Sequence, residues 1–166
     1  SSRQLHFAFV GAFRQHAVDG SVGGQLYACR TLMTSPITDF VRFTPIDSTM
    51  ASVPPPPLRR RMWTAAERLG RFLRVVTRRD VDGALIFTSA GASLLEKSVM
   101  AMLAHRAGKR VVLSPRSGLI KDDVARSPLV GRALARVLQS CDVVLCQGAG
   151  WKRFFEDLGG VPERMM

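Results

Sequence analysis

Short apolar runs alternate along this chain with longer segments, and the two kinds of pattern predict different elements. A buried strand appears as about four to eight consecutive apolar residues, whereas a helix repeats apolar positions every three or four residues. Five runs are therefore predicted to be strands: residues 5–11, 40–46, 83–88, 110–113 and 142–146.

The segments between these runs are predicted to be helices, and several carry their own start or stop signals. Ser93 with Glu96 three residues later matches a capping box, and Gly108 is a natural helix end. Ser127 followed by Pro128 is typical of a helix start. The predicted helices cover residues 25–33, 58–79, 93–108, 129–139 and 150–158.

Strands and helices thus alternate throughout, which is the pattern of a parallel sheet covered by helices. Because crossovers between parallel strands are right-handed, the expected fold is α/β, a doubly wound, mostly parallel Rossmann-like sheet with helices on both faces. The length of 166 residues suits one domain over residues 1–166.

Composition narrows the class of protein. Apolar residues make up 46% and charged residues 22%, a globular rather than a disordered balance. No apolar run reaches the ~18 residues of a transmembrane helix, and the first residues, which lack an initiator Met, do not match a signal peptide. Cys29, Cys141 and Cys146 form no CxxC pair, so we expect a fragment from a reducing, cytoplasmic protein without a zinc site.

The net charge of +11 means that the surface attracts anions, such as nucleic acid, lipid headgroups and nucleotide phosphates. The predicted helix 58–79 holds eight Arg and one Glu, and a basic amphipathic helix can lie on an anionic membrane. The alternative is that its apolar stripe packs on the sheet while the Arg face is solvated. The arginines assigned to membrane contact are Arg60, Arg71, Arg74 and Arg78.

Ligands of such sheets bind at the carboxyl ends of the strands. This rule selects four loops rich in Gly or Ser, at residues 11–24, 89–92, 114–123 and 147–150. In the first loop, Gly20, Gly23 and Gly24 precede a helix whose free N–H groups suit an anion, although the loop matches neither GxGxxG nor a Walker A motif. A flexible loop with a Gly helix start is the competing interpretation.

Other candidates lie in the same loops. Arg116 can pair a phosphate or carboxylate through its planar guanidinium, but a surface Arg beside a turn is the simpler interpretation. His16 and Asp19 lie in the glycine-bearing loop, where solvated or capping roles compete with ligand contact. No Ser-His-Asp or Cys-His pair and no metal spacing is present. The residues assigned to an acceptor-side cleft are His16, Ser89, Arg116, Ser117 and Gln147.

Three segments together resemble the N-terminal half of GT-B glycosyltransferases of the family 4 type. The first strand leads into a loop that ends in Gly23 and Gly24. Residues 111–119, VVLSPRSGL, are similar to the family's strand followed by SPRG-L or SPHG-L. Residues 140–147 with the following helix are similar to its A-D-x-V-x-x-x-S segment. Ser117 interrupts the usual Arg-Gly pair, and Gln147 stands where Ser is common.

The resemblance implies the acceptor-binding domain of a retaining, metal-independent transferase that moves sugar from a nucleotide sugar to a glycan or lipid-linked acceptor. It implies no cofactor, a glycine loop near the donor diphosphate, a donor-binding domain absent from residues 1–166, and an inactive isolated fragment. It is compatible with a cytoplasmic protein peripheral to the inner face of a membrane.

Two other classes compete with this interpretation. A non-catalytic basic module for anionic membrane or nucleic acid would explain the charge, although no nucleic-acid motif is visible, so nucleic acid is not favoured. Another enzyme of GT-B architecture, such as a nucleotide-sugar epimerase, would share the fold.

Overall fold

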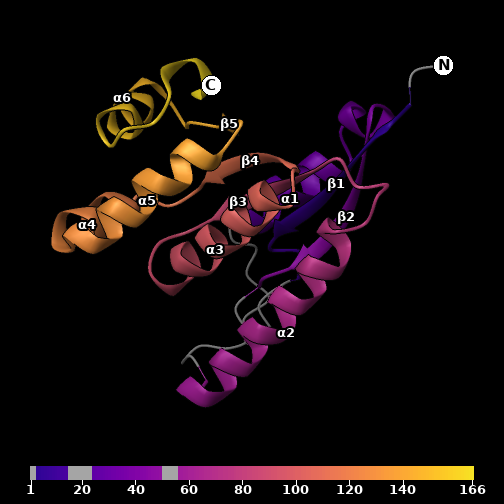
Figure 1. The fold of residues 1–166 in the computed structure, drawn as a ribbon, viewed down its shortest axis with the longest axis horizontal. Coiled ribbons are helices and arrows are strands. Elements are labelled where there is room, and N and C mark those ends of the chain that lie inside the picture. Colours follow the sequence, from indigo (N-terminus) through magenta and orange to yellow (C-terminus); the bar gives the residue numbers. More distant parts are fainter. Residues whose placement is uncertain (1–2, 15–23, 50–55) are drawn as a thin grey trace. The chain divides into compact units, whose positions relative to one another are not determined.

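The computed structural model describes residues 3–14, 24–49 and 56–166 of the chain. Its five strands run parallel in the order β2-β1-β3-β4-β5, and helices connect them (Figure 1). The predicted α/β class and the Rossmann-like parallel sheet are therefore confirmed. The chain divides into two compact units, Ser1–Asp82 and Gly83–Met166, which are taken in turn.

The first unit is built around two strands, β1 (Leu5–Gly11) and β2 (Val41–Asp47), paired in parallel from Leu5↔Val41 to Gly11↔Asp47. The helix α2 packs against both strands. It buries Phe72 and Val76 completely, whereas α1 buries Cys29. The helical segments of this unit are α1 (Gly24–Met33), the 3₁₀ turn η1 (Pro36–Asp39) and α2 (Leu58–Val76).

The second unit is built around β3 (Gly83–Thr88), which is buried along its whole length and pairs with β4 (Arg110–Pro115). The short β5 (Val143–Val144) pairs with β4 in turn. The helix α3 packs against β3 and β4. The helices of this unit are α3 (Ala92–Arg106), α4 (Ile120–Arg126), α5 (Pro128–Ser140), α6 (Ala149–Asp157) and the 3₁₀ turn η2 (Pro162–Arg164).

Helix boundaries follow the predicted signals in two of three cases. The Ser127 hydroxyl accepts a hydrogen bond from Val130 N–H at 3.5 Å, with Pro128 in the first helical position, as expected. Gly108 has a φ of +72° just beyond α3, which suits its predicted role as a helix end. The capping box at Ser93 is wrong, because Gly91 is the N-cap and α3 already begins at Ala92.

The three largest differences from the predicted elements are an added helix, a shorter strand and a shorter helix. The helix α4 was not expected, since residues 114–123 were predicted to be a loop. The strand β5 spans two residues rather than the five of residues 142–146. The helix α2 ends at Val76 rather than at Arg79, because the next residues form a turn in which Arg78 binds Asp80.

The amino end of β1 carries a polar network that holds the first unit together. His6 is buried, and its Nε2 lies 2.7 Å from the Thr44 hydroxyl of β2. The Arg42 guanidinium lies 2.8 Å from Nδ1 of His6 and donates to the Asp80 carboxylate at 3.0 Å. Nδ1 of His6 also lies 3.2 Å from that carboxylate, so Arg42 and Asp80 both face this nitrogen while Thr44 faces Nε2. This places His6 in the structural role expected of a strand histidine.

Candidate functional site

The carboxyl ends of β3 and β4 bring two of the predicted site residues together. Thr88 pairs with Pro115, and the N–H of Arg116 donates to the Thr88 carbonyl at 2.8 Å. Ser89 and Arg116 therefore leave two neighbouring strands at one edge. Thr88 and Ser114 are both buried there, so this edge combines polar groups with an apolar sheet.

The guanidinium of Arg116 has a defined place at this edge. It lies 5.2 Å from the centre of the Phe87 ring, a distance at which a cation is attracted to an aromatic face. The side chain is half-buried, and no acidic group among residues 3–14, 24–49 and 56–166 pairs with it. Arg116 can thus offer its N–H groups to an anionic ligand.

Ser117 follows the carboxyl end of β4, and Gln147 follows that of β5, but their surroundings differ. The Ser117 hydroxyl accepts from Leu119 N–H at 3.3 Å, so it shapes the turn that leads into α4. Gln147 is exposed between β5 and α6. The structure brings neither side chain into hydrogen-bond contact with Arg116.

Two contacts at this edge were not expected from the sequence. The carboxylate of Asp123 in α4 accepts from Gly91 N–H at 2.7 Å and so ties α4 to the turn before α3. Lys121, also in α4, places its ammonium 4.4 Å from the centre of the Trp151 ring in α6. Both contacts depend on α4, a short helix that the sequence pattern did not predict.

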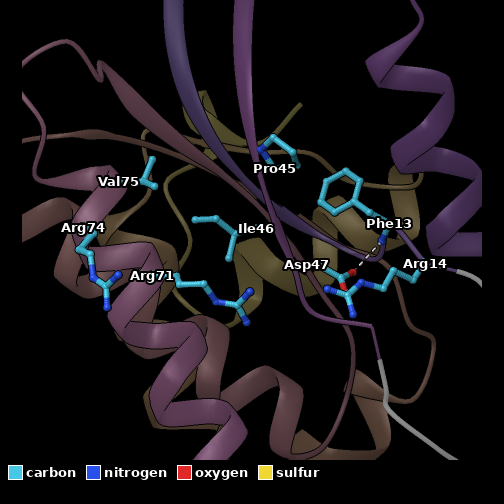
Figure 2. Close-up of a pocket in the computed structure, with 8 residues that line it drawn as sticks. All are labelled: Phe13, Arg14, Pro45, Ile46, Asp47, Arg71, Arg74 and Val75. Carbon is cyan, nitrogen blue, oxygen red and sulfur yellow. Dashed lines mark hydrogen bonds and ion pairs between the residues drawn. The ribbon is translucent and has the colours of Figure 1, made fainter.

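The first unit contains a pocket of about 400 Å³ at the carboxyl ends of β1 and β2, covered on one side by α2 (Figure 2). This volume lies in the range of small-molecule sites. The lining mixes three arginines and one acid with apolar side chains. The lining residues are Phe13, Arg14, Pro45, Ile46, Asp47, Arg71, Arg74 and Val75.

The single acid of this pocket, Asp47, already has hydrogen-bond and ion-pair partners within the protein. Its carboxylate accepts from the Thr49 hydroxyl at 2.6 Å and from Phe13 N–H at 3.0 Å, and it pairs with Arg14 at 3.0 Å. Burial alone would raise the pKa of Asp47, but these hydrogen bonds and the Arg14 charge outweigh it, so the pKa lies below 3.8. Asp47 is therefore ionised at neutral pH and neutralises Arg14.

The arginines assigned to membrane contact fall in three different surroundings. Arg71 and Arg74 line the pocket of the first unit. Arg78 donates two hydrogen bonds of 2.9 Å to Asp80, so its charge already has a partner. Arg60 is exposed in the first turns of α2.

The glycine-bearing loop is described only at its end. Gly24 is the first residue of α1, and a Cβ added there would meet nothing within 4 Å. His16, Asp19, Gly20 and Gly23 lie outside the described residues. Their assignments stay predictions.

The described part of the chain contains neither a metal-binding cluster nor a membrane-spanning helix. No three His, Cys, Asp or Glu side chains there lie close enough to hold a metal ion. None of the helices there has both the length and the apolar character that crossing a membrane requires.

Comparisons with protein-family models, with curated proteins and with solved structures returned no match.

Proposed function

We propose that this chain is the acceptor-side domain of a glycosyltransferase that moves a sugar from a nucleotide-sugar donor to a glycan or lipid-linked acceptor. The observation that supports the proposal best is the position of Arg116. It follows β4 within the SPR segment that resembles the family, its backbone is bonded to the end of β3, and its guanidinium is held over Phe87 without an acidic partner among the described residues.

Sugar transfer requires a positively charged or hydrogen-bond-donating group such as the Arg116 guanidinium. Sugar transfer releases a nucleoside diphosphate, and the negative charge that develops on it, or that an acceptor already carries, must be stabilised by fixed donors. An arginine held by a neighbouring ring and by its own backbone loses little freedom on binding. Gly24, the first residue of α1, suits the same chemistry on its own, because a Cβ there would meet nothing within 4 Å and the first N–H groups of a helix favour an anion.

The test is kinetic and uses the complete gene product. Arg116→Lys keeps the positive charge but removes the planar fork, so kcat/KM for sugar transfer is expected to fall about tenfold or more. Arg132→Lys is the matched control, since Arg132 is exposed on α5. Equal rates for the two variants would remove Arg116 from the site.

A second candidate function, contact with an anionic membrane, is favoured by one observation. The first turns of α2 expose three large apolar side chains, Leu58 at 68%, Met62 at 65% and Trp63 at 69%. Arg59, Arg60 and Arg61 are exposed in the same turns. Exposed apolar and basic side chains on one helix suit the interface of an anionic bilayer.

A further inference from the structure

The pocket of the first unit has a charge imbalance that the proposed transferase chemistry does not use. Its walls contribute three guanidinium groups, from Arg14, Arg71 and Arg74, against the single carboxylate of Asp47. Asp47 is already bonded to Arg14 and to three donor groups on Phe13 and Thr49. The exposed side chains of Arg71 and Arg74 therefore bring two further positive charges to the lining of this space of about 400 Å³.

These two charges come from neighbouring positions of one helix. Arg71 and Arg74 are three residues apart on α2, so their side chains lie on one face. The helix is anchored beneath them, because Phe72 and Val76 are completely buried. Figure 2 shows the Arg71 side chain reaching from α2 past Ile46 toward Asp47, with Arg74 further along the helix. Among the described residues, no acid pairs with either arginine.

The rest of the lining is apolar. Ile46 is 4% exposed, and Phe13 is held edge-on against the Phe9 ring at 5.1 Å. Pro45 and Val75 complete this wall. A ligand that fits therefore carries an anionic group for the arginines and an apolar or ring portion for the wall.

We propose that this pocket binds an organic phosphate, with Arg71 and Arg74 holding the phosphate oxygens and the Ile46–Phe13 wall holding the group attached to them. Arginine pairs match the geometry of phosphate oxygens through two parallel N–H bonds. The phosphate belongs either to a free small molecule or to a lipid headgroup, and both present the same chemistry. This site lies wholly within the first unit and is independent of the role proposed for Arg116.

The test is calorimetric titration of the 166-residue protein with phenyl phosphate, inorganic phosphate and dihexanoyl phosphatidic acid. The Arg71→Gln/Arg74→Gln variant is expected to bind phenyl phosphate at least about tenfold more weakly. Arg59→Gln/Arg61→Gln removes the same charge from positions of the same helix that do not line the pocket and is expected to change affinity less than about twofold. Inorganic phosphate is expected to bind more weakly than phenyl phosphate, because it leaves the apolar wall empty.

Each outcome decides the proposal. Tighter binding of phosphatidic acid than of phenyl phosphate, lost only in the pocket variant, identifies a lipid headgroup, and the reverse order identifies a free organic phosphate. Equal losses in the two variants would show attraction to net charge alone and overturn the pocket. Absence of saturable binding of every probe at millimolar concentration would overturn it as well. Thermal unfolding of both variants checks that each is folded, and Arg74→Gln alone provides a milder second variant.

Discussion

Two glycines show how differently one residue type is used in this chain. A Cβ added at Gly160 would overlap Met165 and lie 2.7 Å from the backbone oxygen of Phe155, whereas one added at Gly24 would meet nothing within 4 Å. Because a backbone atom cannot give way, Gly160→Ala is expected to lower the free energy of unfolding by about 2 kcal/mol. Gly24→Ala is expected to change it by less than about 0.5 kcal/mol. Urea unfolding of both variants measures this difference, and similar losses would contradict it.

Asp82 gives the fold a dependence on pH. It accepts from His6 N–H at 2.8 Å and from Arg3 at 2.7 Å. The hydrogen bond from His6, opposed by desolvation and helped by Arg3, holds the pKa of Asp82 below 3.8. Because the folded pKa lies below the unfolded one, this stabilisation is present above about pH 4 and is lost as the pH falls through the folded pKa.

Asp82→Asn is therefore expected to flatten the acid limb of the stability curve. The free energy of unfolding, measured by urea titration between about pH 5 and pH 2, should fall less steeply in the variant than in the unmodified protein. Asp157→Asn serves as the control, since Asp157 is exposed on α6. An unchanged slope for Asp82→Asn would contradict the argument.

At the scale of elements, α2 has two halves with different surroundings. Its carboxyl half buries Phe72 and Val76, as the predicted apolar stripe requires. Its amino half exposes Leu58 and Met62, although these two residues fall in the same predicted apolar stripe, and it also exposes Trp63. Periodicity predicts the helix and its stripe, but it does not show where along the helix the packing partner ends.

The exposed half carries the membrane prediction. Leu58→Ser/Met62→Ser/Trp63→Ser is expected to reduce binding to anionic vesicles about a hundredfold at low salt, because each of the three apolar groups contributes roughly 1 kcal/mol and about 1.4 kcal/mol corresponds to tenfold. Co-sedimentation with anionic and neutral vesicles at two salt concentrations measures this. Leu119→Ser/Leu129→Ser removes exposed apolar side chains elsewhere and is the control. Binding that ignores lipid charge, or that survives the α2 substitutions, would exclude the idea.

Short elements were the ones that the sequence did not predict. The helix α4 has seven residues and buries only Ile120, so it is too short to show a helical period. The N-cap of α3 was misplaced because Gly91, with a φ of +69°, starts the helix two residues before Ser93. In both cases Asp123, which accepts from Gly91 N–H, fixes the local structure through a contact distant in sequence.

For the whole molecule, the parallel α/β fold could be predicted because alternating strands and helices leave few arrangements. The edge at Ser89 and Arg116 could also be predicted, since it follows from the ends of adjacent strands. The pocket could not, because its walls come from residues near Phe13, near Ile46 and near Arg74. Among the eight Arg of residues 58–79, Arg71 and Arg74 were assigned to membrane contact, and the sequence pattern did not mark them as pocket residues.

The most direct test of the proposed function is the transfer of sugar by the complete gene product, measured as release of nucleoside diphosphate from a panel of nucleotide sugars with a membrane and glycan extract as acceptor. The proposal predicts turnover of at least one nucleotide sugar that depends on the added extract, and no turnover by the 166-residue chain alone. Release of no nucleoside diphosphate from any donor, or full turnover by the 166-residue chain, would contradict it.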